Sequence, residues 1–356
     1  MQKKYIALAV AALASGAAFA QTSVVFGGIV DMGYSYKSSF STSGTAARSA
    51  VDQGGQDGSR LFWTATEDLG NGLSVSAKQE IRIAADVRGS VGIDSSVLTL
   101  AGKSWGAVRA GNYGSVADDI NGFSEAGGMG WGNGVFDITP VGTTYNVVGY
   151  VSPDFGGFQA KLNYSTNDKN ADDANGNGSV NIRSYGVNGV YVGNGLKLGA
   201  AYQRRSAVDV PVITLSPANY LVSAVGFKTT EWLLSGGYTF GQFSVGAGYD
   251  REKTVDGSDD FKRTAWRITG GFAITPNDQV ALSYSRLKYD MAGDVAKANG
   301  YGVSYSHMLS KRTNVYASYG HISQSDSTAL YANDNGNGLF DAAYKSMFKV
   351  GLRHQF

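Results

Sequence analysis

Hydrophobic and polar positions alternate with a period of two along most of the chain. Within residues 73–83, for example, Val75 and Ile81 fall on one face, and Lys78 and Arg82 fall on the other. Successive side chains of a β-strand point to opposite faces, so this period is typical of strands whose two faces meet different surroundings. After residue 20 the chain has neither a convincing 3.6-residue apolar stripe nor the run of about 18 apolar residues that a transmembrane helix needs. The pattern predicts an all-β protein.

The connections between these segments alternate between tight turns and long polar loops. Tight turns are predicted at 70–72, 194–195 and 310–312, for example, and longer stretches rich in Gly, Ser and Asp lie between them. Short turns on one rim and long loops on the other are typical of outer-membrane barrels, which in bacteria have an even number of strands. We therefore predict a transmembrane 16-stranded antiparallel β-barrel with short periplasmic turns and long extracellular loops. The predicted strands are 23–37, 59–69, 73–83, 95–102, 106–112, 143–152, 157–167, 183–193, 196–206, 227–240, 242–251, 263–274, 279–290, 298–309, 313–323 and 344–356.

The first twenty residues have the composition of an export signal. Lys3 and Lys4 precede an apolar run at 5–19, and the run ends in the small-residue pattern Ala18-Phe19-Ala20. A membrane anchor is the alternative, but about 15 apolar residues are few for a span. We expect cleavage after Ala20 and localisation to the cell outer membrane. The predicted domains are a signal peptide at 1–20 and a single transmembrane β-barrel pore domain at 21–356.

The composition narrows the chemistry that the chain can perform. It has no Cys, 17% charged residues and a formal net charge of +1. These values exclude disulfides and thiolate metal sites and argue against nucleic acid as a partner. Aromatic residues gather beside turns, as expected of the girdles that mark the two surfaces of a membrane. Candidate girdle residues include Tyr150, Tyr164, Tyr238, Tyr301 and Tyr316.

Several short motifs, taken in order, resemble one known family. They are Val25-Phe26-Gly27-Gly28-Ile29-Val30-Asp31, Gly106-Ala107-Val108-Arg109-Ala110-Gly111, Ser152-Pro153-Asp154-Phe155-Gly156-Gly157-Phe158 and the terminal Gly351-Leu352-Arg353-His354-Gln355-Phe356. With these motifs, the chain resembles the trimeric general porins of Gram-negative outer membranes, in particular the β-proteobacterial type. The resemblance covers essentially the whole chain after the signal peptide.

The resemblance implies a function and a set of partners. It implies a water-filled channel for passive diffusion of small hydrophilic solutes and ions, with no cofactor. It also implies a homotrimer embedded in outer-membrane lipid and lipopolysaccharide, whose third long loop folds into the lumen. In similar porins the barrel-assembly machinery reads the terminal strand, so the resemblance makes Phe356 the assembly signal.

The segment 113–142 follows the fifth predicted strand, where the resemblance places the infolded loop. It is long, lacks strand alternation, and carries acidic residues but no Lys or Arg. Charges on the neighbouring strands must point inward, because on the lipid face each costs about 2–4 kcal/mol near the midplane. The predicted constriction residues are Arg60, Lys78, Arg82, Arg109 and Lys161 on the wall, and Asp118, Asp119 and Glu125 on the loop. We expect Arg82 and Arg109 to face Asp118 and Asp119, and the basic wall to favour mild anion selectivity.

Other functions remain as alternatives. A substrate-specific outer-membrane channel is the nearest, and a surface adhesin or receptor is more distant because the loops lack apolar anchors. A barrel enzyme is disfavoured because His307, His321 and His354 lie on three separate predicted strands, with no Ser-His-Asp set. The sequences at 173–178 and 333–341 partly match Ca²⁺ loops, but Asn/Gly turns explain them better. We predict no catalytic, cofactor or metal site.

Overall fold

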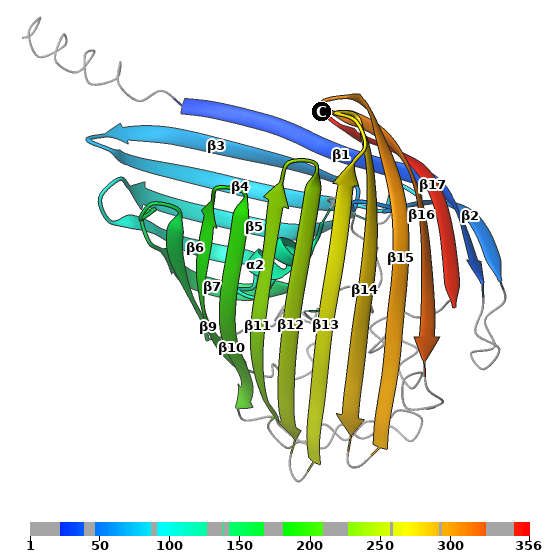
Figure 1. Ribbon diagram of the computed structural model, residues 1–356. Helices are drawn as coiled ribbons and strands as arrows, with labels where there is room; N and C mark the ends of the chain where they lie inside the picture. Colours follow the sequence, from blue (N-terminus) through cyan, green and yellow to red (C-terminus); the bar gives the residue numbers. More distant parts are fainter. Residues whose placement is uncertain are drawn as a thin grey trace, which may run out of the picture.

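The described residues form one antiparallel sheet that curves round on itself (Figure 1). The computed structural model describes residues 22–38, 47–86, 91–126, 138, 142–166, 181–208, 227–256, 259–291, 294–324 and 345–356. The strands are β1 (Thr22–Ser38), β2 (Arg48–Gln53), β3 (Arg60–Gly70), β4 (Leu73–Ile83), β5 (Val91–Gly102), β6 (Gly106–Gly114), β7 (Thr143–Val151), β8 (Phe158–Ser165), β9 (Asn181–Gly193), β10 (Leu196–Val208), β11 (Phe227–Phe240), β12 (Phe243–Asp256), β13 (Asp259–Ala273), β14 (Asp278–Met291), β15 (Asp294–Ser310), β16 (Thr313–Gln324) and β17 (Ser346–Gln355). A short helix, α2 (Asp118–Asn121), and a 3-10 turn, η1 (Gly122–Ser124), follow β6.

Strand pairing closes the sheet into a barrel. From β3 onwards each strand pairs with the next, and β17 pairs with β1. β2 and β3 both lie along β1, at residues 32–37 and 22–29. They therefore act as one barrel strand interrupted at 54–59, and the predicted 16-stranded barrel is confirmed. Among the described strands, closure leaves no sheet edge unpaired, as a membrane-spanning sheet requires.

The tight turns lie where the sequence predicts them. Asn71 and Gly72 have φ values of 52° and 77°, and Asn194 and Gly195 have values of 51° and 77°. Two consecutive residues with positive φ define the hairpin turn that matches strand twist, and Asn-Gly adopts it readily. These turns lie on the rim that carries the C-terminus, which runs from the left to the top of Figure 1.

The two faces of the barrel differ in chemistry. Large apolar side chains on the outer face, such as Leu98, Leu234 and Leu282, are 57–63% exposed because no other part of the described chain covers them. The inner face buries polar residues instead. The girdle prediction was wrong for Tyr316, which is 2% exposed and donates a hydrogen bond to the inward-facing Asp31 (2.5 Å). In the part of the chain that the structure describes, no helix is long and apolar enough to cross a membrane.

Some strands extend further than their sequence pattern indicated. The predicted loop at 252–262 is largely strand, since β12 runs to Asp256 and β13 starts at Asp259. Alternation fades there because Arg251, Glu252 and Lys253 are consecutive charged residues, whereas backbone pairing continues regardless of side-chain type. β2 was missed for a similar reason, because its six residues carry no clear apolar face.

Candidate functional site at the infolded loop

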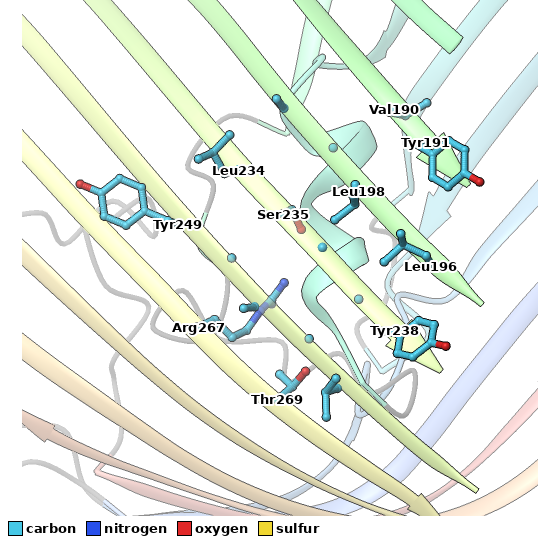
Figure 2. A pocket seen from close by; sticks show the side chains of 18 of the residues that line it. Val190, Tyr191, Leu196, Leu198, Leu234, Ser235, Tyr238, Tyr249, Arg267 and Thr269 are labelled. Atoms are coloured by element: carbon cyan, nitrogen blue, oxygen red, sulfur yellow. The ribbon is translucent and has the colours of Figure 1, made fainter. Parts of the chain in front are cut away.

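The segment after β6 turns into the barrel and packs on its inner wall. α2 and η1 contact β10–β13 and lie behind the sheet in Figure 2. Asn188 Nδ2 donates to the carbonyl of Val116 (2.9 Å), and Thr269 Oγ1 donates to the carbonyl of Ser124 (2.7 Å). Ile120 is fully buried in the apolar cluster between loop and wall. The described part of the loop, 115–126 and 138, therefore confirms that it folds inward.

Two arginines of β13 hold this loop in place. Arg267 is 2% exposed and reaches the carbonyl of Asn121 (2.8 Å), Ser124 Oγ (2.6 Å) and Glu125 Oε1 (3.0 Å). Arg263 donates a hydrogen bond to the carbonyl of Ile138 (2.6 Å) and another to the buried Asp250 of β12 (2.8 Å). Because a buried guanidinium is costly unless its donors are used, this geometry fixes the loop backbone tightly.

Glycines on the same wall let the loop approach the strands closely. A Cβ on Gly199 would lie 2.8 Å from Ile120 Cβ, and one on Gly246 would lie 2.4 Å from the carbonyl oxygen of Ser124. Real Cβ contacts are longer than this, so any side chain at Gly246 would displace the loop. The high Gly content of the chain thus has a specific use on this inner surface.

A second, shorter segment also enters the lumen, between β2 and β3 at residues 54–59. Asp31 is fully buried and accepts hydrogen bonds from the backbone N–H groups of Gln56 (2.7 Å) and Asp57 (2.8 Å). Asp57 in turn pairs with Arg353 (2.9 Å) and Arg60 (2.7 Å). Nothing in the sequence pattern indicated this segment, although the buried Asp31 lies on the predicted inward face of its strand.

The predicted constriction residues fall into two groups, and the first lies at the loop. Asp119 Oδ2 pairs with Lys161 Nζ (2.9 Å) and lies 3.9 Å from Arg109 Nη2. The guanidinium of Arg109 also lies over the ring of Tyr113, 4.1 Å from its centroid. Lys161 and Arg109 are only 20% and 17% exposed, so their charges are largely occupied in holding the loop.

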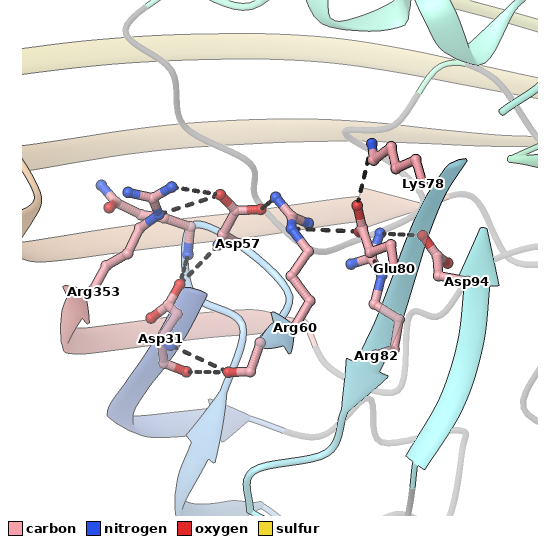
Figure 3. A network of polar contacts seen from close by, with 10 residues as sticks. Asp31, Asp57, Arg60, Lys78, Glu80, Arg82, Asp94 and Arg353 are labelled. Carbon is pink, nitrogen blue, oxygen red and sulfur yellow. Dashed lines mark hydrogen bonds and ion pairs between the residues drawn. The ribbon is translucent and has the colours of Figure 1, made fainter. Parts of the chain in front are cut away.

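The second group lies on β3 and β4 and forms a network around Glu80 (Figure 3). Glu80 contacts Arg60 (3.5 Å), Lys78 (3.9 Å) and Arg82 (3.7 Å). Arg82 forms its other ion pair with Asp94 (3.2 Å). Arg82 therefore belongs to the Glu80 network and lies apart from the Asp119 cluster, which it was expected to face. The side chains of Lys78 and Arg82 remain 49% and 46% exposed, which leaves them accessible to ions in the lumen.

The two other acids of the loop have different surroundings. Asp118 is exposed at the start of α2, and its backbone N–H donates to Ser115 Oγ (3.0 Å). Glu125 pairs with Arg267 on the wall of β13. Sequence reasoning missed Arg263 and Arg267, although the alternation at Arg263, Ala265 and Arg267 places them inward by the rule that found the other wall residues.

Both Ca²⁺-like sequences, 173–178 and 333–341, lie outside the described residues. Among the described residues, no cluster of three or more His, Cys, Asp or Glu side chains is arranged to hold a metal ion.

A closed antiparallel barrel with an apolar outer face, a polar lumen and an infolded loop defines a membrane pore. The family model for Gram-negative porins matches residues 7–327, and the chain belongs to this family. It is an outer-membrane channel for passive diffusion of small hydrophilic solutes and ions.

Individual relatives agree with the family assignment. An outer-membrane porin protein of Bordetella pertussis is 27% identical, and the match covers 100% of both chains. The anion-selective porin from Comamonas acidovorans has a similar structure, with a TM-score of 0.73, 23% identity, and 94% of this chain and 100% of that chain covered. The trimer form of OmpT from Vibrio cholerae gives a TM-score of 0.71 at 16% identity, with 94% and 99% covered. At these identities, the two solved structures establish the shared fold.

Proposed function

We propose that the channel prefers anions mildly, and that Lys78 and Arg82 set this preference. The observation that carries the proposal is the contrast in exposure between the two groups of wall cations. Lys78 and Arg82 are almost half exposed, whereas Arg109 and Lys161 are mostly covered and share Asp119. Fixed charges along a narrow passage select ions by sign, and a guanidinium stays charged at any working pH. The Comamonas porin with the same fold is anion-selective, which supports the proposal.

Within this proposal Arg109, Lys161 and Asp119 have a positioning role. They tie the base of the infolded loop to β6 and β8, while Arg267 and Glu125 tie its far part to β13. Arg60 orients Glu80 and the segment at 54–59. Asp118, which is exposed, would contribute a negative charge on the opposite side of the passage.

The test is a double substitution, Lys78→Ser with Arg82→Ser. We expect the ratio of anion to cation permeability to fall by about two- to tenfold, because these half-exposed charges act on an ion through water, where two unit charges 4 Å apart interact by about 1 kcal/mol and about 1.4 kcal/mol is a factor of ten. Reversal potentials in a KCl gradient give this ratio. The matched control is Arg286→Ser with Lys288→Ser, which removes two cations from the outer face of β14. An unchanged ratio in the lumen variant would refute the assignment.

The same proposal includes assembly and export. We infer a homotrimer, cleavage of residues 1–20 as a signal peptide, and a single pore domain at 21–356 inserted by the barrel-assembly machinery with Phe356 as its signal. Membership of the porin family supports a diffusion channel over a substrate-specific channel, an adhesin or a barrel enzyme. The trimer form of the similar Vibrio cholerae barrel supports the oligomeric state.

A further inference from the structure

The segment between β2 and β3, at residues 54–59, enters the lumen with its backbone held by β1. The buried carboxylate of Asp31 accepts hydrogen bonds from the N–H groups of Gln56 (2.7 Å) and Asp57 (2.8 Å), and the Gly54 N–H donates to the carbonyl of Asp31 (3.2 Å). Charge-assisted hydrogen bonds of this kind are the strong ones. The wall therefore fixes where each side chain of this lumen segment points.

Two glycines let the lumen segment lie directly against the wall. A Cβ on Gly55 would overlap the hydroxyl of Tyr316, and one on Gly58 would overlap the guanidinium of Arg82. No side chain could occupy either position without displacing its neighbour. Asp57, which lies between these contacts in the sequence, is thus brought into the lumen at a defined place.

The carboxylate of Asp57 lies between two arginines (Figure 3). Its Oδ2 accepts hydrogen bonds from Nε (3.2 Å) and Nη2 (2.9 Å) of Arg353 on β17, and its Oδ1 pairs with Nη2 of Arg60 on β3 (2.7 Å). β1 lies between β17 and β3 in the sheet, so the two arginines come from strands that do not pair. Asp57 therefore connects two cations that the sheet alone would leave apart.

These contacts begin a longer row of ion pairs on the lumen wall. The row continues through Glu80 to Arg82 and Asp94. Its cations are Arg60, Lys78, Arg82 and Arg353, and its carboxylates are Asp57, Glu80 and Asp94. Arg60 has Glu80 as a second partner (3.5 Å), whereas among the described residues the acid that pairs with Arg353 is Asp57. Loss of the Asp57 charge would leave every cation of the row in place and Arg353 without an ion pair.

We propose that Asp57 is a specificity-determining residue that keeps the anion preference of the channel mild. This inference rests on the function proposed above, in which Lys78 and Arg82 attract anions. The side chains of Arg60, Arg353 and Asp57 are 19%, 21% and 27% exposed, so all three charges border the lumen. An ion that passes the row meets the summed field of these charges, and the carboxylate weakens the attraction of the two guanidiniums for an anion.

The competing explanation is that Asp57 only holds the lumen segment at the wall. Asp57→Asn separates the two roles, because an amide has nearly the shape of the carboxylate but no charge. The substitution also keeps the backbone N–H groups that Asp31 binds, so the anchor of the segment is unchanged. A change in ion preference would then follow from the charge itself.

The test measures reversal potentials of the purified channel in planar bilayers under a KCl gradient. For Asp57→Asn we expect the ratio of anion to cation permeability to rise by about two- to fivefold, because one carboxylate disappears while the cations remain. Adding Arg353→Gln to Asp57→Asn restores the charge balance of the row and should return the ratio to the wild-type value. The matched control is Asp290→Asn, which removes a carboxylate from the outer face of β14 and should leave the ratio unchanged.

A ratio for Asp57→Asn equal to that of the wild type would overturn the proposal. So would a charge-balanced double variant that keeps the raised ratio, since a structural effect does not depend on the sum of charges. Failure of the proposed function looks different: Lys78→Ser with Arg82→Ser would then leave the ratio unchanged, whatever Asp57→Asn does.

A second measurement applies if Asp57→Asn fails to fold, and it uses the absence of Cys from the chain. Asp57→Cys with Arg353→Gln removes both charges of the pair and introduces a single thiol. In the folded channel this thiol is modified with either the negatively charged sulfonatoethyl or the positively charged trimethylammonioethyl methanethiosulfonate. We expect the negative adduct to lower the permeability ratio and the positive adduct to raise it, each by about two- to fivefold. A ratio that does not depend on the sign of the adduct, or a thiol that neither reagent reaches, would overturn the proposal.

Discussion

Replacement of Gly246 by Val is expected to lower the single-channel conductance by about a third or more, because pore width at the constriction limits ion flow. A Cβ at this position would lie 2.4 Å from the carbonyl oxygen of Ser124 and 2.7 Å from Thr269 Oγ1. The loop would therefore have to move off the wall and toward the pore axis. That shift breaks the hydrogen bonds of Thr269 to Ser124 O and of the Ala126 N–H to Thr269. Overpacking of this kind costs about 1–3 kcal/mol.

The matched control is Gly270→Val on the neighbouring strand. A Cβ at Gly270 has no heavy atom within 4 Å, because this residue lies on the opposite, outward phase of β13. The control should keep wild-type conductance and should fold normally. A Gly246→Val channel that conducts as well as or better than the wild type would contradict the docked position of the loop.

Deletion of Phe356 is expected to lower the amount of folded protein in the outer membrane several-fold, while export across the inner membrane continues. The backbone N–H of Phe356 donates to the carbonyl of Gly28, and its carbonyl accepts from the N–H of Gly28, each at 3.1 Å. The ring lies on the outer face, stacked on His354 with centroids 6.2 Å apart. The deletion removes both hydrogen bonds from the seam between β1 and β17, and each contributes about 0.5–1.5 kcal/mol. A loss of this size lowers abundance several-fold in cells.

The control for this deletion is Phe348→Ala, which removes an aromatic ring from the same outer face of β17 but leaves the seam pairing intact. Heat-modifiable migration of the folded barrel on a gel measures assembly in both cases. If the two variants assemble equally well, the terminal position has no special role.

The architecture could be predicted because strand alternation and turn composition are local properties. Tight turns such as Asn71-Gly72 need only two residues to define them, and the lipid-facing half of each strand repeats every second residue. The segment at 54–59 could not be predicted in this way, because its place in the lumen depends on a partner distant in the sequence. Asp31, which holds the segment, lies on another strand.

The sequence predicted which residues of the candidate site lie on charged strand faces, but it predicted their positions around the barrel only in part. Alternation correctly put Arg82, Arg109 and Lys161 on charged strand faces, but it gives no position around the barrel. Arg109 and Lys161 meet Asp119 because β6 and β8 flank the start of the loop, whereas Arg82 on β4 meets Asp94 on β5. The wall glycines are harder still to assign, since alternation places Gly246 inward but does not show that the infolded loop packs directly against it.

The most direct test of a water-filled, mildly anion-preferring channel is the reversal potential of the purified wild-type protein in planar bilayers under a KCl gradient. Discrete conductance steps should appear, and the reversal potential should have the sign set by chloride. A reversal potential with the sign set by potassium would contradict the role given to Lys78 and Arg82, and a protein that produced no conductance steps would contradict the channel itself.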